Sequence, residues 1–169
     1  VKDSLPTNTM SAPAIWDGRY AYIFAGESNG HKLDRIVKYD PFVEFGIEVM
    51  TTKLPSPRVG ASAIWDGRNA YIFGGHDGNH TFLTEIVRYN TSSDIIFLMS
   101  AKLPTAIAGT SAIWDGSSVY VFGGRGESAI YDNILRYDPV TDTTHIVDVS
   151  LPSARYHTSA IWDGESAYI

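Results

Sequence analysis

The apolar residues of this chain fall in short runs rich in β-branched and aromatic side chains, separated by polar residues, glycine and proline. Runs of this kind with turn-forming residues at both ends predict β-strands. No window of about eleven residues or more carries the apolar period of an amphipathic helix. We therefore expect a chain built of strands, without helices.

Four of these runs make one unit, best seen over residues 62–65, 70–75, 85–90 and 95–99. The first run, SAIW, ends at Asp66-Gly67, a pair that favours a tight type I′ hairpin turn. The second ends in two glycines, which predicts a sharp bend or a close approach of another backbone. After the fourth run, a Leu-Pro segment leads into the next SAIW.

This unit repeats along the chain. The pentapeptide AIWDG occurs four times, and its tryptophans follow one another at steps of 49, 49 and 48 residues. The Leu-Pro pairs keep the same steps. A fixed period of this length is the mark of a repeat architecture. We place the repeats at 11–58, 60–107 and 109–155, with a partial repeat at 158–169, in a single domain over residues 1–169.

Three further features of the repeat resemble kelch signatures. They are the glycine pairs Gly74-Gly75 and Gly123-Gly124, the Tyr-Asp pairs Tyr39-Asp40 and Tyr137-Asp138, and the arginines Arg58 and Arg155 after Leu-Pro. The chain departs from the kelch pattern in carrying its tryptophan on the first strand of the repeat, and not on the fourth. The resemblance implies an all-β, kelch-like β-propeller of four-stranded antiparallel blades.

A propeller ring typically closes with four to eight blades. The chain carries three full repeats and part of a fourth, so we expect it to be a fragment of a larger ring. The alternative is a ring assembled from several copies of the chain.

The recurrence of one residue type in every repeat indicates a structural role. We therefore expect the four tryptophans to pack between neighbouring blades. The alternative is a ring of exposed indoles that stacks on a carbohydrate or aromatic ligand. These residues are Trp16, Trp65, Trp114 and Trp162.

Charge and composition exclude several functions. The chain has 13 basic and 19 acidic residues, a net charge of −6, and its basic residues are scattered, which argues against a nucleic-acid partner. No apolar run is long enough for a membrane span in this segment. The absence of cysteine excludes thiolate metal sites, cysteine nucleophiles and the cysteine-crosslinked tyrosine of copper oxidases on a kelch scaffold.

The repeats differ most in two sets of loops, which join the second strand to the third and the fourth strand to the next first strand. In a four-stranded antiparallel blade, both sets emerge on the same face. Charged and aromatic side chains gather in these loops, as on a binding surface. The candidate binding residues are Arg58, His76, Asp77, Arg125, Glu127, Tyr131, Arg155 and Tyr156.

Histidines in these loops raise the question of a metal site. The pair His76 and His80 lies in a glycine-containing loop, where the spacing does not preset two ligands as it does on a helix. We expect no metal and no cofactor. No nucleophile elbow of the GxSxG type is present, so we expect a non-catalytic module.

Two N-x-S/T triplets offer glycosylation candidates, Asn79 and Asn90, in predicted loops or turns. They favour an extracellular or cell-surface glycoprotein, with a cytoplasmic location as the alternative. The sequence as a whole predicts a module whose variable loops bind a protein partner or a surface glycan. Two alternatives stay open: a glycan-active or other enzyme on the same face, and a structural surface or filament component that self-associates.

Overall fold

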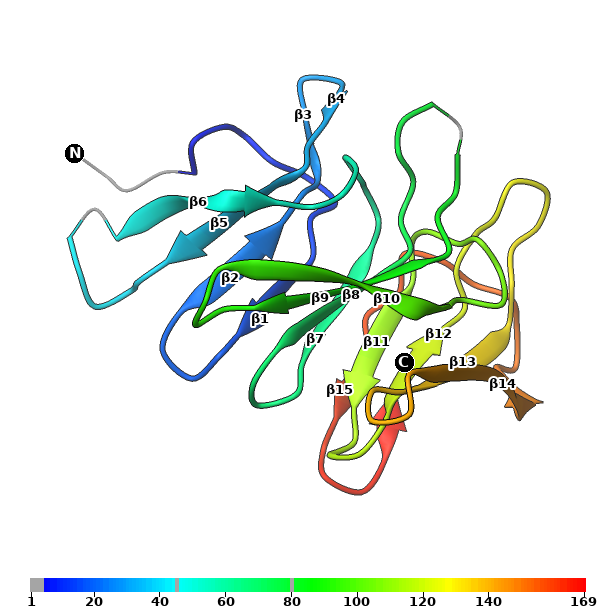
Figure 1. The fold of residues 1–169 in the computed structure, drawn as a ribbon. Coiled ribbons are helices and arrows are strands. Elements are labelled where there is room, and N and C mark those ends of the chain that lie inside the picture. Colours follow the sequence, from blue (N-terminus) through cyan, green and yellow to red (C-terminus); the bar gives the residue numbers. More distant parts are fainter. Residues whose placement is uncertain (1–4, 45, 80) are drawn as a thin grey trace.

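The computed structural model describes residues 5–44, 46–79 and 81–169, and in this part of the chain every regular element is a strand (Figure 1). Three four-stranded antiparallel sheets follow one another, here called blades 1 to 3. A two-stranded sheet, here called blade 4, comes after them. The prediction of an all-β propeller with four-stranded antiparallel blades is confirmed.

The strands of each blade lie in chain order. Blade 1 contains β1 (Ala14–Trp16), β2 (Ala21–Phe24), β5 (Arg35–Tyr39) and β6 (Ile47–Lys53). Blade 2 contains β7 (Ser62–Trp65), β8 (Ala70–Phe73), β9 (Glu85–Asn90) and β10 (Ile95–Lys102). Blade 3 contains β11 (Ser111–Trp114), β12 (Val119–Phe122), β13 (Asn133–Asp138) and β14 (Thr143–Ser150). Blade 4 contains β15 (Ile161–Trp162) and β16 (Ala167–Tyr168), and a separate small hairpin contains β3 (Glu27–Ser28) and β4 (His31–Lys32).

The core is divided among the junctions between blades. Strand β8 shows how, because successive side chains of a strand point to opposite faces of its sheet. Ala70 and Ile72 belong to the cluster shared with blade 1, whereas Tyr71 and Phe73 belong to the cluster shared with blade 3. All four residues are buried, so this strand is apolar throughout because both faces of blade 2 are covered.

The recurring tyrosine of the third strand packs across a junction in the same way each time. The Tyr89 ring lies 5.8 Å from that of Phe24 in blade 1, and the Tyr137 ring lies 5.7 Å from that of Phe73 in blade 2, both edge to face. Edge-to-face contacts at this separation are a favoured arrangement of aromatic rings. One repeated residue thus makes one repeated inter-blade contact.

The tryptophans lie at the same junctions. Trp65 packs against the cluster between blades 1 and 2, Trp114 against the next cluster and Trp162 against the last. Trp16 lies in blade 1, and 48% of its surface is exposed. The four indoles also line an open hollow of about 290 Å³, together with the isoleucines of their motifs and with Ala63, Ala112 and Ala160.

The glycine pairs form the sharp bend and the close backbone approach that the sequence predicts, and they do so where the connection to the next blade passes. Gly74 and Gly75 have φ angles of +59° and +103°, which side chains rarely adopt. A Cβ on Gly74 would lie 2.4 Å from the carbonyl oxygen of Ile107, the residue whose carbonyl also accepts a hydrogen bond from the Gly75 N–H. The sharp bend therefore allows a backbone contact with the connection from blade 2 to blade 3.

The prediction of a type I′ turn at Asp-Gly is wrong. Trp65 pairs with Ala70, so the loop has four residues, and Gly67 has a positive φ whereas Asp66 does not. The Asp66 carboxylate instead accepts hydrogen bonds from the N–H groups of Arg68 and Asn69. The aspartate recurs because its side chain closes a wider loop.

A second recurring aspartate links the outer strands of neighbouring blades through hydrogen bonds. Asp94, in the β9–β10 turn, accepts hydrogen bonds from the Thr52 N–H of β6 and from the Tyr89 hydroxyl. In the next repeat, Asp142 accepts bonds from the Ser100 N–H of β10 and from the Tyr137 hydroxyl. Each turn thus binds the outer strand of the preceding blade, a contact that the sequence patterns did not predict.

Candidate functional site

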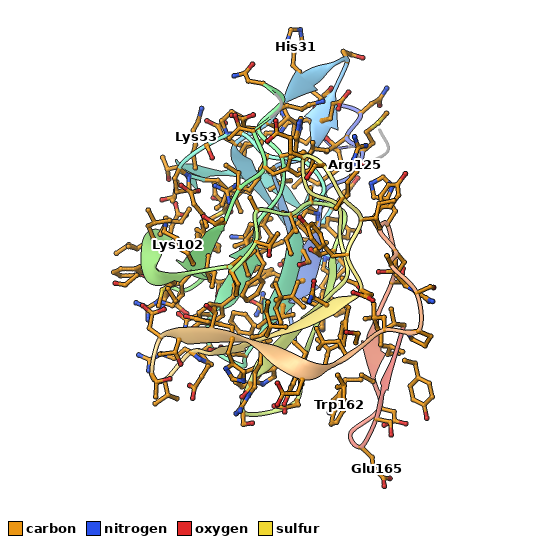
Figure 2. All side chains as sticks on the ribbon, turned by 90° about the vertical axis from the view of Figure 1, so that its right-hand side faces the viewer. His31, Lys53, Lys102, Arg125, Trp162 and Glu165 are labelled. Carbon is orange, nitrogen blue, oxygen red and sulfur yellow. The ribbon has the colours of Figure 1, made fainter. Side chains whose placement is uncertain are left out.

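The two variable sets of loops meet at one end of the molecule, here called the loop face. In Figure 2, His31 and Arg125 lie toward this end, and Trp162 and Glu165 lie toward the opposite end. Residues of the two sets pair directly, since Val59 forms a β-bridge with His76 and Ala108 forms one with Arg125. The backbone therefore holds both sets in one fixed arrangement.

A cleft of about 540 Å³ opens on the loop face, where blades 2 and 3 meet the connection into blade 4. This volume falls within the range usual for ligand sites. Two aromatic pairs border the cleft: His76 with Phe82, at 4.9 Å between ring centres, and Tyr156 with His157, at 4.8 Å. Arg125 and Glu127 add one charge of each sign.

The floor of the cleft is a chain of backbone hydrogen bonds that runs from blade to blade. The Gly60 N–H donates to the Ser11 carbonyl, the Gly109 N–H to the Gly60 carbonyl and the His157 N–H to the Gly109 carbonyl, at 3.0, 2.6 and 2.7 Å. All four residues have φ angles between +52° and +67°. This left-handed conformation, unusual for serine and histidine, recurs at one position of every repeat. We call these four residues the floor ring.

Four of the predicted binding residues line the cleft: His76, Arg125, Glu127 and Tyr156. Tyr156 is 41% exposed, and Arg125 and Glu127 are exposed as well. They come from two different loops and one inter-blade connection, so the fold brings together residues that lie up to 80 positions apart in the sequence. These side chains are accessible to a ligand.

Arg58 must be corrected, because its side chain is 0% exposed and cannot contact a ligand on the surface. Its guanidinium donates hydrogen bonds to the Glu85 carboxylate at 2.7 Å, to the Ser56 hydroxyl at 2.9 Å and to the Gly74 carbonyl at 3.3 Å. Burial lowers the pKa of Arg58, while the bond to Glu85 favours its charged form. Arg58 is a buried structural cation.

The remaining three candidates have contacts within the fold. The Asp77 carboxylate accepts hydrogen bonds from the N–H groups of Asn79 and Thr81, which hold the pKa of Asp77 below its usual range. Tyr131 packs partly buried against the core between blades 2 and 3. Arg155 donates to the hydroxyl and carbonyl of Ser153, just as Arg58 does to Ser56.

Comparison with known proteins decides the family. Residues 11–169 match the family model described as the KLHDC2/KLHL20/DRC7 Kelch-repeats domain. The chain belongs to the kelch-repeat family. No curated protein matches the chain.

Among solved structures, this kelch chain is similar to the one titled "Structure of YjhT". The TM-score is 0.84 and the sequence identity 17%, over 96% of this chain and 56% of that chain. The likeness therefore shows the propeller fold, and the chain spans little more than half of the length of that structure.

The sequence did not single out several residues that shape the site of this kelch domain. Phe82 forms a wall of the cleft, and the floor ring depends on Gly60 and Gly109. A signal was present, because these glycines lie six residues after Leu54 and Leu103 and keep the 49-residue step. The Asn29-Gly30 pair was a second missed signal, since both residues have positive φ in the two-residue turn of the β3–β4 hairpin.

Other expectations concern metals, glycans and membranes. The described residues contain no group of three or more histidine, aspartate or glutamate side chains that could hold a metal, and His80 lies outside the described residues. Asn79 is exposed, whereas the Asn90 side chain accepts hydrogen bonds from the N–H groups of Ser92 and Ser93. Within the described part of the chain, no helix has the length and apolarity to cross a membrane.

Proposed function

We propose that this kelch domain is a non-catalytic interaction module whose loop-face cleft binds a peptide segment of a protein partner. The cleft itself is the observation that supports the proposal. Its aromatic walls offer apolar contact area, while Arg125 and Glu127 offer charged contacts of opposite sign. Aromatic and arginine side chains are the residue types that contribute most to binding energy in protein interfaces.

The architecture also suits binding without rearrangement. The floor ring and the β-bridges hold the walls of the cleft through backbone hydrogen bonds. A site that is already ordered loses little conformational entropy when it binds. We expect the loop face to bind its partner with little change of shape.

Selection from a phage-displayed library of random twelve-residue peptides tests this proposal. The protein should enrich related sequences, and Tyr156→Ala should weaken their binding by about tenfold, as expected for the loss of an exposed aromatic contact. Arg68→Ala, a substitution of an exposed side chain in the β7–β8 turn at the opposite end of the inner strands, serves as the control and should bind as the parent does. Failure to enrich any family of peptides, or equal weakening by both substitutions, would refute the proposal.

A glycan is the second candidate ligand. The imidazole, phenyl and phenol rings at the cleft favour it, because sugar rings pack their apolar faces on aromatic side chains. The exposed Asn79 in its N-x-T triplet supports an extracellular or cell-surface setting for such a ligand. Binding of the protein to an immobilised glycan panel that is lost with Tyr156→Ala would favour this candidate over the peptide.

A further inference from the structure

The loop face presents one pair of side chains in each repeat at equivalent positions. One member directly follows the glycine pair, or Ala25-Gly26 in the first repeat, and the other directly precedes the floor-ring residue. A β-bridge joins the two members in each case. These bridged pairs are Met10 with Glu27, Val59 with His76, and Ala108 with Arg125.

Backbone atoms alone hold each bridged pair. The N–H groups of Val59 and His76 each donate to the carbonyl of the other, at 3.0 and 2.9 Å. Ala108 and Arg125 exchange the same two bonds, at 2.9 and 2.8 Å. The geometry of the pair therefore does not depend on its side chains, and the side chains can differ between repeats without loss of the bridge.

The side chains do differ, and they differ in a regular way. The position after the glycines changes charge from repeat to repeat, from Glu27 to His76 to Arg125. Its bridge partner stays apolar but becomes smaller, from Met10 to Val59 to Ala108. One position of the pair thus varies in charge and the other varies in size.

The charged members of the pairs stand in different surroundings. The Glu27 carboxylate forms an ion pair with Lys32 of the adjoining hairpin strand. Arg125 lines the cleft, and no ion pair of its guanidinium occurs among the residues that the structure describes. Arg125 therefore supplies a positive charge, on a backbone held by the bridge, beside the apolar surface of Val59, Ala108 and Phe82.

Glu127 provides a contrast within the same loop. It lies at the tip of a turn closed by a hydrogen bond from the Gly126 N–H to the Ala129 carbonyl, outside the β-bridge. Its backbone is less firmly held than that of Arg125, because Arg125 forms β-bridges with both Ala108 and Ile130.

We propose that the bridged pairs, and not the tips of the loops, determine which peptide the loop face accepts. The residue after the glycine pair sets the charge of the preferred peptide, and its bridge partner sets the size of the side chain that fits beside it. For the pairs in the cleft, the preferred segment carries an acidic side chain facing Arg125 and an apolar side chain over Val59 and Ala108. This inference rests on the proposed function, since it assumes that the cleft binds a peptide.

Charge reversals at two neighbouring positions test the charge rule with the same twelve-residue peptide library. We expect the parent protein to enrich peptides with Asp or Glu beside an apolar residue. Arg125→Glu should lower the recovery of those peptides by about tenfold and should enrich peptides with Lys or Arg in their place. Glu127→Arg, a reversal of opposite sign at the loop tip of the same cleft, should shift the recovery and the charge pattern less than Arg125→Glu does. Glu165→Arg, a reversal at an exposed side chain in the β15–β16 turn at the opposite end of the molecule, serves as the control and should bind as the parent does.

Ala108→Val tests the size rule. Valine occupies the equivalent bridged position in blade 2, so the backbone accepts it. We expect Ala108→Val to select peptides with a smaller apolar residue next to the acidic one. The unfolding midpoint of each variant should lie close to that of the parent, which establishes that the variants are folded.

The outcomes separate the two proposals. Peptides that are enriched by the parent but keep the same charge pattern with Arg125→Glu would overturn the role of the bridged pairs and leave the proposed function intact. A charge pattern that follows Glu127→Arg as strongly as Arg125→Glu would overturn it as well. Absence of enrichment by the folded parent would overturn the proposed function and this inference together.

Discussion

The ion pair between Arg58 and Glu85 is a case in which removal of a negative charge should destabilise the fold strongly. We consider Glu85→Gln. The Arg58 side chain is fully buried, so the substitution leaves its positive charge without a neutralising partner in the interior. The hydrogen bonds to Ser56 and Gly74 remain, but their acceptors carry no net charge.

The size of the destabilisation follows from the positive charge that is left unpaired in the interior. Loss of one member of a buried ion pair typically costs about 3 to 5 kcal/mol, because an uncompensated buried charge remains. We expect Glu85→Gln to fall in this range. Arg58→Met should cost less, about 1 to 3 kcal/mol, because the Glu85 side chain is 26% exposed and water can solvate its carboxylate. The double substitution should recover much of the loss of Glu85→Gln, since it leaves no charge in the interior.

Urea unfolding measures these differences through tryptophan fluorescence, since three of the indoles lie at blade junctions. Arg155→Met is the matched control, because Arg155 makes the same contacts with Ser153 and no ion pair among the described residues; it should cost less than about 1 kcal/mol. A free energy of unfolding for Glu85→Gln within about 0.5 kcal/mol of the parent would refute the reasoning, and so would a double variant less stable than Glu85→Gln.

Three further predictions concern the junctions and the dependence of stability on pH. Trp65→Ala should cost about 2 to 4 kcal/mol of unfolding free energy, whereas Trp16→Ala, at the half-exposed indole, should cost about 1 kcal/mol; equal losses in urea unfolding would contradict the junction role. Burial raises the pKa of Asp94, but hydrogen bonds from Tyr89 and Thr52 outweigh it and hold the pKa below its usual range. This stabilisation is present above about pH 4 and is lost as the pH falls through the lowered pKa, so Asp94→Asn should flatten the acid side of a plot of melting temperature against pH. Burial raises the pKa of Tyr22 to about 12, so the unfolded state ionises first and stability should fall between about pH 10 and pH 12; Tyr22→Phe should lose less stability over that interval.

The sequence was sufficient to predict the blades because their signals are local and repeated. The strand runs and the glycine pairs can be recognised from adjacent residues along the chain. Each of these patterns also recurs at the 49-residue step, which strengthens the prediction. The Asp66-Gly67 turn was misassigned for a local reason too. The dipeptide is compatible with a two-residue turn, and only the pairing of Trp65 with Ala70 reveals that the loop has four residues.

The site was harder to predict, because a position in a loop does not tell which way a side chain points. Arg58 and Arg125 both lie in variable loops, yet one is buried and the other is exposed. The partner that buries Arg58, Glu85, lies 27 residues away, on the third strand of the next repeat. The recurring Gly60 and Gly109 were a signal for the floor ring, but its hydrogen-bond partners could not be foreseen, because the bonds join backbone atoms of residues about 49 positions apart.

The main-chain hydrogen bonds that connect the repeats have a consequence for how such a chain can lengthen and diversify in evolution. The N–H groups of Gly26, Gly75 and Gly124 each donate to a carbonyl in the connection that leads to the next blade, and the floor ring links the repeats through amides as well. A contact made by main-chain atoms is the same whichever side chains flank it. A newly duplicated copy of the repeat would therefore dock onto its neighbour at once, before any compensating substitution, and its exposed loops could then drift independently.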